Sequence, residues 1–189
     1  MKGIVIGMTA ALVALPAAAQ ESGWYAGLSV GSSKAGDTCS NVDASATCDD
    51  KTTAVKLIGG YQVNRNFAVE LGFTPQLAKA SASEPGVTEQ IKSSAFEAVL
   101  VPSLPIGDFS LFGKLGIYAA HTEDTVNFFG TETTTSASNS DVTYGVGAGY
   151  QFTRSLGARV EWQRYSKVGG GDFGKADIDV VSLGLLYRF

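Results

Sequence analysis

Apolar and polar residues alternate with a period of two in one segment after another along this chain. Between residues 142 and 152 the even-numbered positions hold valine, tyrosine, alanine and phenylalanine, whereas the odd-numbered ones hold threonine, glycine and glutamine. Successive side chains of a β-strand point to opposite faces, so this pattern predicts a strand with one apolar and one polar face. The alternation recurs in eight segments: 24–31, 55–62, 67–74, 95–101, 109–118, 142–152, 156–163 and 181–189. The chain is therefore predicted to be all-β, with about eight strands.

The fourth segment is the least regular of the eight. Phe96, Ala98 and Leu100 share one parity, but the other parity holds alanine and valine beside Glu97. If the register follows the phenylalanine, the polar face of this strand is partly apolar.

The spacers between these segments alternate in length. Short turns are predicted near Asn64, within 102–108 and near Arg154. Long polar loops are predicted between them, over Ser32–Lys51, Gln76–Gln90, His121–Ser140 and Ser166–Lys175. Short periplasmic turns and longer extracellular loops are typical of bacterial outer-membrane barrels. The spacing thus predicts an up-and-down antiparallel barrel that crosses a membrane.

Charged side chains decide which face of the predicted barrel meets lipid. They fall on the glycine-rich parity, and a lysine or arginine facing the bilayer midplane costs about 2–4 kcal/mol. We therefore predict a charge network inside the lumen, formed by Glu70, Glu97, Lys114, Arg159 and Glu161. Side chains fill the interior of an eight-stranded barrel, which argues against a large pore. A soluble lipocalin-type barrel, the main alternative fold, has the opposite polarity.

Aromatic residues cluster near the chain ends and the short turns. We expect them to form a girdle at the periplasmic interface; its members are Trp24, Tyr61, Phe67, Phe109, Tyr150, Phe152, Tyr187 and Phe189. A thinner set, Phe73, Tyr144 and Trp162, is expected at the other interface.

The first 19 residues have the pattern of a secretory signal peptide. Lys2 precedes an apolar run that is too short to span a bilayer, and Ala17 and Ala19 fit a cleavage site before Gln20. We expect residues 20–189 to form a single barrel domain. Without Lys2 the net charge falls from −4 to −5, which disfavours nucleic acid as a partner. Cys39 and Cys48 are predicted to form a disulfide in the oxidising compartment, and no metal or other cofactor is expected.

Several segments together resemble the opacity-protein and outer-membrane protein A-type barrels. They are Gly23-Trp24-Tyr25-Ala26-Gly27, Gly60-Tyr61-Gln62-Val63-Asn64, Phe67-Ala68-Val69-Glu70-Leu71-Gly72 and the terminal Leu185, Tyr187 and Phe189. The resemblance implies an integral barrel in the outer membrane of a Gram-negative bacterium. It also implies that Tyr187 and Phe189 form a terminal signal for the outer-membrane assembly machinery. Because the chain stops at Phe189, no peptidoglycan-binding domain is expected.

Three functions remain open from the sequence. The first is a non-enzymatic structural, envelope-integrity or adhesin-like role, in which the extracellular loops contact host or cell-surface ligands. Outer-membrane lipids and lipopolysaccharide are further expected partners. The second is a narrow, porin-like channel for small solutes. The third is a lipid A-modifying hydrolase using His121, the lone histidine; the His-x-Ser pattern of such barrels is missing because Glu123 replaces the serine. Such catalysis needs a hydroxyl within hydrogen-bond reach of the imidazole.

Overall fold

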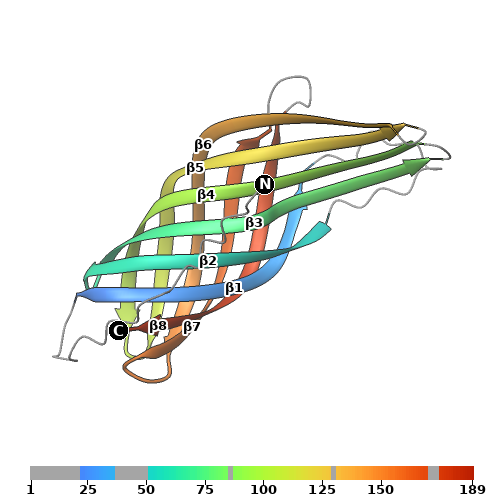
Figure 1. Ribbon diagram of the computed structural model, residues 1–189. Coiled ribbons are helices and arrows are strands. Elements are labelled where there is room, and N and C mark those ends of the chain that lie inside the picture. The colour runs from blue at the N-terminus through green and yellow to red at the C-terminus, as the bar shows by residue number, and fades with distance from the viewer. Residues whose placement is uncertain (1–21, 37–50, 85–86, 129–130, 170–174) are drawn as a thin grey trace, which may run out of the picture.

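The computed structural model describes residues 22–36, 51–84, 87–128, 131–169 and 175–189. Eight strands run through these ranges (Figure 1). Their bounds are β1 Gly23–Ala35, β2 Lys51–Asn64, β3 Phe67–Glu84, β4 Val87–Ile106, β5 Phe109–Phe128, β6 Thr131–Gln151, β7 Leu156–Val168 and β8 Ala176–Arg188. The part of the chain that is described holds no helix long and apolar enough to cross a membrane.

The strands form a closed barrel in which each pairs antiparallel with its neighbours in sequence. The ring closes between β1 and β8, where Ala26 lies opposite Tyr187 and Leu28 opposite Leu185. The amide of Phe189 also donates a hydrogen bond to the carbonyl oxygen of Trp24, at 3.1 Å. The predicted fold class, an up-and-down antiparallel barrel of eight strands, is confirmed. Closure pairs every strand on both sides within the barrel wall, as a lipid environment requires.

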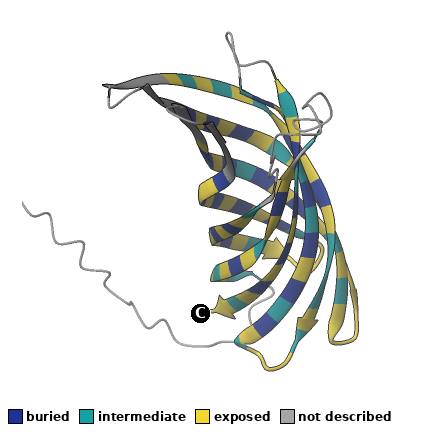
Figure 2. Cartoon of the chain, turned by 90° about the vertical axis from the view of Figure 1, so that its right-hand side faces the viewer, coloured by how far each residue is buried: buried dark blue, intermediate teal, exposed yellow. Residues whose placement is uncertain are grey.

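The outward parity is apolar and the inward parity is polar, as the alternation predicted. Leu115, Ile117 and Leu183 are each at least 60% exposed, whereas Lys114 and Ser182 on the other parity are buried. Where the side chains are described, buried residues alternate along the strands with exposed or partly exposed ones (Figure 2). The fourth strand follows its predicted register, with Phe96 and Leu100 outside and Val99 inside. This polarity is the opposite of that expected for a lipocalin-type barrel.

Aromatic side chains gather at the short-turn end of the outer wall. Trp24 contacts Tyr61, Phe109 contacts Tyr150, and the ring centroids lie 5.0 and 4.7 Å apart. Tyr187 packs edge-on against Phe189 at 5.3 Å. Amphipathic rings at this level suit the membrane interface, which supports the predicted girdle.

Two of the predicted long loops are in fact strands. The structure continues β3 to Glu84 and β4 from Val87, so Gln76–Gln90 is a hairpin and not a loop. Likewise β5 runs to Phe128 and β6 starts at Thr131, which corrects His121–Ser140. Low hydrophobicity suggested loops, but threonine has a high strand propensity, and residues 131–135 contain four threonines. Most of the other two predicted loops, residues 37–50 and 170–174, lies outside the described residues, whereas residues 32–35 belong to β1 and 166–168 to β7.

The two long hairpins together form one sheet that extends beyond the barrel, here called the projecting sheet: residues 78–84 of β3, 87–93 of β4, 122–128 of β5 and 131–137 of β6. The register is continuous across it, from Ala78 opposite Ser93 to Thr122 opposite Ala137. In Figure 1 these strands reach past the ends of β1 and β2 on the long-hairpin side.

The barrel interior holds two apolar clusters at different levels. One packs Tyr25, Ile58, Ala68, Val99 and Val101, and Phe112 and Leu186 lie against it. The other packs nine residues near the long-hairpin end, including Leu77, Tyr118, Tyr165 and Val180. Buried charged side chains occupy the lumen between these groups, and they form the site described next.

Candidate functional site

A lumen network of six charged side chains crosses the interior of the barrel. It consists of Lys56 on β2, Glu70 on β3, Glu97 on β4, Lys114 on β5, and Arg159 and Glu161 on β7. All six are buried. The five residues predicted for the lumen thus face it, and they lie within one connected set.

Glu70 accepts contacts from three sides. Arg159 approaches it as a fork, with Nη1 2.6 Å from Oε1 and Nη2 3.2 Å from Oε2. Lys114 Nζ lies 3.0 Å from Oε2. The hydroxyl of Tyr25 donates a hydrogen bond to Oε1 at 2.7 Å. Such charge-assisted and bidentate contacts are the strongest that a carboxylate makes with side chains.

Glu161 joins the two halves of the network. Its Oε2 lies 2.9 Å from Lys114 Nζ and 3.2 Å from Arg159 Nε. Its Oε1 lies 3.3 Å from Lys56 Nζ. One carboxylate therefore contacts every cation of the network.

Glu97 is held on the other side of Lys56. Lys56 Nζ lies 3.3 Å from Glu97 Oε1 and donates to Gln163 Oε1 at 2.6 Å. Gln163 in turn donates to Glu97 Oε2 at 2.8 Å, and the Tyr165 hydroxyl donates to the same carboxylate. The side-chain amide of Gln163 on β7 thereby bridges Lys56 on β2 and Glu97 on β4.

The network is electrically balanced, because three cations face three carboxylates. Moving single charges out of water is costly, and only close pairing with further hydrogen bonds offsets that cost. Every charge of the network has a close ion-pair partner, although Lys114 Nζ, Arg159 Nε and Glu161 Oε2 make no hydrogen bond besides. The ion pairs connect β2, β3, β4, β5 and β7 across the lumen. Among the described residues, no cluster of histidine, cysteine and carboxylate side chains is suited to hold a metal ion.

Lys56, Tyr25, Gln163 and Tyr165 were missing from the predicted network. Their parity gave a usable signal: Lys56 lies on the polar face of its segment, and Gln163 shares the face of Arg159 and Glu161. Which of these side chains meet depends on strand stagger, which the alternation does not determine.

Gly60 leaves the space through which the Tyr25 side chain extends to Glu70. Gly60 lies between Tyr25 and Glu70 in the register of β1, β2 and β3. A Cβ at position 60 would lie 2.2 Å from Cζ of the Tyr25 ring. The tyrosine therefore crosses above a residue without a side chain to contact Glu70 on the far strand.

Other predicted site residues lie apart from the network. Tyr187 and Phe189 are on the outer wall at the barrel seam, both more than half exposed. Cys39 and Cys48 lie outside the described residues, and their disulfide remains a prediction.

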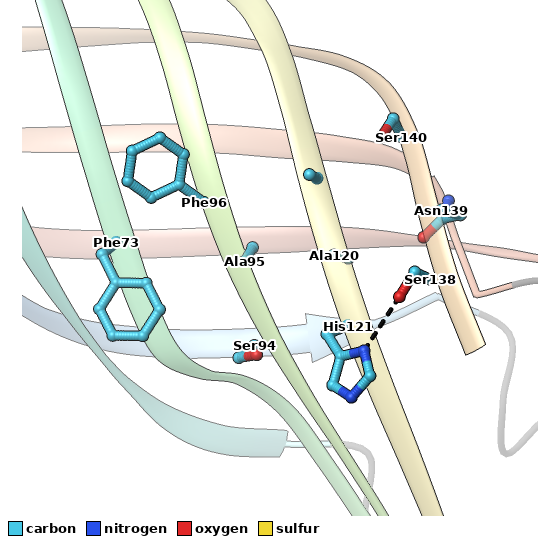
Figure 3. A pocket seen from close by; sticks show the side chains of 10 residues that line it. Phe73, Ser94, Ala95, Phe96, Ala120, His121, Ser138, Asn139 and Ser140 are labelled. Atoms are coloured by element: carbon cyan, nitrogen blue, oxygen red, sulfur yellow. Dashed lines mark hydrogen bonds between the residues drawn. The ribbon is translucent and has the colours of Figure 1, made fainter. Parts of the chain in front are cut away.

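His121 lies on the outer wall of β5, with its side chain half exposed. Its Nδ1 is 2.9 Å from Oγ of Ser138 on β6, and its Nε2 is 3.6 Å from Oε1 of Glu123. A shallow depression of about 340 Å³ opens beside it, with Phe73, Phe96, Ser94 and Ser140 among its lining residues (Figure 3). Sequence reasoning identified the histidine but not the serine, because Ser138 becomes its neighbour only through strand pairing.

A closed eight-stranded barrel with an apolar outer wall and a charged lumen defines an integral outer-membrane protein. Residues 5–189 match the family described as the outer membrane protein beta-barrel domain, and the chain belongs to this family. Outer membrane protein A of Klebsiella aerogenes is 26% identical over 199 residues, covering all of this chain and 56% of the relative. The chain thus spans about half the length of this curated relative.

Solved structures of outer-membrane barrels have the same fold. Neisserial surface protein A superposes with a TM-score of 0.59 at 12% identity, covering 90% of this chain and all of that chain. Ail, the attachment invasion locus protein of Yersinia pestis, was crystallised with the heparin analogue sucrose octasulfate. It superposes on this chain with a TM-score of 0.57 at 18% identity. That comparison covers 88% of this chain and 99% of the other. These likenesses show that the chain shares the barrel fold of these proteins.

Proposed function

We propose that this protein is a surface-interaction protein whose projecting sheet binds partners outside the cell. The observation that carries the proposal is an open strand edge. Within the described strands, residues 131–142 of β6 pair with β5 alone, because pairing with β7 begins only at Thr143. The backbone N–H and C=O groups on that side are a template for an added strand.

At Asn139, near the barrel, this edge is hydrogen-bonded to the end of β7, whereas residues 131–137 belong to the projecting sheet. The side-chain amide of Asn139 donates to the carbonyl oxygen of Lys167 at 2.6 Å, and its Oδ1 accepts from the amide of Gly169 at 3.3 Å. Residues 131–142 also contain no proline, which would remove a backbone donor from the edge. A rooted, proline-free edge supports binding of an extended peptide segment by strand addition.

The narrow channel is the less supported reading. The six charges of the lumen network and the two apolar clusters lie in the space that a solute would have to cross. We infer a structural role for the network, which holds opposite walls of the barrel together. Cleavage of residues 1–19, the disulfide, and recognition of Tyr187 and Phe189 by the assembly machinery remain parts of this proposal.

Two matched hairpin truncations test the surface function. In the first, Asn-Gly replaces residues 124–135, so that a two-residue turn joins the paired residues Glu123 and Ser136. In the second, Asn-Gly replaces 81–90 and joins Ala80 to Ile91. The probe is attachment of bacteria expressing each variant to immobilised extracellular-matrix protein.

The first truncation is expected to abolish attachment, because it removes residues 131–135, the part of the open β6 edge that lies farthest from the barrel. The second should retain it, because that edge remains. Heat-modifiable gel mobility checks that both barrels fold. Attachment that survives the first truncation in a folded protein would contradict the proposal that residues 131–135 of the β6 edge bind the partner.

A further inference from the structure

On the outer wall of the barrel, a histidine lies between a serine and a glutamate. The register pairs His121 on β5 directly with Ser138 on β6, and Glu123 follows two residues along β5 on the same face. Ser138 Oγ lies 2.9 Å from Nδ1 and Glu123 Oε1 lies 3.6 Å from Nε2 of the same ring. Figure 3 shows the histidine ring turned toward Ser138 at the edge of the depression.

The position of the carboxylate favours one tautomer of the histidine. A proton on Nε2 faces the negative charge of Glu123, which leaves the Nδ1 lone pair directed at the hydroxyl of Ser138. Nδ1 can then accept the hydroxyl proton while Oγ acts as a nucleophile. A nucleophile within hydrogen-bond reach of a base, with the base oriented by a third group, is the general pattern of an activated serine.

The adjacent depression has the shape and the place for an acyl chain. Phe73 and Phe96 flank it, while alanine and serine side chains, including Ala119 and Ser140, leave it hollow. The neighbouring wall residue Ile117 is 65% exposed and belongs to the apolar surface that faces lipid. The depression thus lies where the apolar wall gives way to the polar hairpins. The ester groups of membrane lipids lie at the same boundary between acyl chains and headgroups.

We propose that Ser138, His121 and Glu123 form a hydrolytic site for ester-linked acyl chains of membrane lipids. Oγ of Ser138 attacks the ester carbonyl carbon as its proton passes to Nδ1 of His121. The ester C–O bond breaks, and the leaving alcohol takes that proton. Water then attacks the acyl-serine, gives a proton to His121 and releases the fatty acid, while Ser138 regains its proton. The net reaction is ester plus water to acid plus alcohol.

This activity goes beyond the proposed surface function. It takes up the hydrolase hypothesis for His121, which the sequence placed behind the expectation of a non-enzymatic protein. That expectation rested on the missing His-x-Ser pattern, in which the serine lies on the strand of the histidine. Here the neighbouring strand supplies the hydroxyl. Ser138 and His121 act on the substrate directly, whereas Glu123 positions the imidazole.

Purified full-length protein in vesicles tests the proposal. One arm contains phosphatidylethanolamine and the other contains lipopolysaccharide, and mass spectrometry follows fatty-acid release. A second measurement uses an alkyl fluorophosphonate, which bonds covalently to activated serines. The variants are Ser138→Ala, His121→Ala and Glu123→Gln. Ser136→Ala is the matched control, because Ser136 is an exposed serine on the same strand, two residues from Ser138, but does not line the depression.

We expect release in one of the two arms, which identifies the lipid class, and a fluorophosphonate adduct at Ser138. Ser138→Ala and His121→Ala should lower the rate on the order of 100-fold or more, with Ser136→Ala close to wild type. Glu123→Gln should lower kcat with little change in KM, because it alters the base and not the lipid contact. Absence of release in both arms together with absence of an adduct would overturn the proposal. Release that is undiminished in Ser138→Ala would overturn it as well.

Discussion

At the scale of single residues, the buried charges of the lumen set the strictest requirement on the sequence. Each carboxylate of the lumen network contacts at least one cation at 3.3 Å or less, and the charges cancel. Breaking a buried set by removing one partner leaves an uncompensated charge, which costs far more than an exposed pair contributes. Glu161 is the most sensitive position because it contacts Lys56, Lys114 and Arg159.

Glu161→Gln is therefore expected to lower the free energy of unfolding by about 3–5 kcal/mol. The measurement is urea-induced unfolding of the barrel in lipid vesicles, followed by tryptophan fluorescence. Asp108→Asn, in the exposed turn between β4 and β5, is the control and should change the value by less than about 0.5 kcal/mol. Equal stability of Glu161→Gln and the control would show that the network does not hold the walls together.

Parity along the sequence was enough to place Glu70, Glu97, Lys114, Arg159 and Glu161 in the lumen. It was not enough to pair them, because Arg159 and Glu70 are 89 residues apart and meet only through the stagger of distant strands. The same limit hid Ser138 from His121. Both contacts follow from register, and a shift of the register would change each one.

At the scale of strands, the two adjacent glycines of β2 differ in the space available for a side chain. Gly60 faces the lumen beneath the Tyr25 ring, whereas no atom lies within 4 Å of a Cβ placed on Gly59, which faces outward. Substituting each glycine by alanine therefore distinguishes two effects: the loss of space inside the barrel, and the general effect of glycine on strand stability.

Gly60→Ala is expected to destabilise the barrel by about 1–3 kcal/mol, since the tyrosine must leave its contact with Glu70. Gly59→Ala should be neutral or stabilise by up to about 1 kcal/mol through the unfolded chain. The same urea unfolding compares the two. If both alanines had equal effects, the passage of Tyr25 over Gly60 would not matter for stability.

The eight strands and their faces could be predicted because alternation is a local signal. The lengths of β3, β4, β5 and β6 could not, since polar threonine-rich segments are compatible with loops or with strands. Continuous pairing between the two hairpins decides in favour of strands, as in Lys92 of β4 opposite Glu123 of β5. Neighbouring strands thus stabilise segments that lack an apolar face of their own.

At the scale of the whole molecule, the barrel wall is closed, and buried side chains of the described residues occupy its lumen. The wall closes between β1 and β8, and the lumen network lies between two apolar clusters. Purified protein in planar bilayers is therefore expected to show no steady conductance over repeated insertions. Discrete, reproducible openings would contradict an occluded lumen and restore the channel hypothesis.

The central claim of this account is that the barrel spans the outer membrane with the projecting sheet outside the cell. Its most direct measurement is antibody binding to intact cells that carry one epitope insertion, either in the hairpin joining β5 to β6 or after Gly107 in the short turn between β4 and β5. We predict binding to intact cells only for the β5–β6 insertion, with the Gly107 epitope detected after the envelope is opened. Binding of intact cells through the Gly107 epitope, with the β5–β6 epitope hidden, would contradict the account.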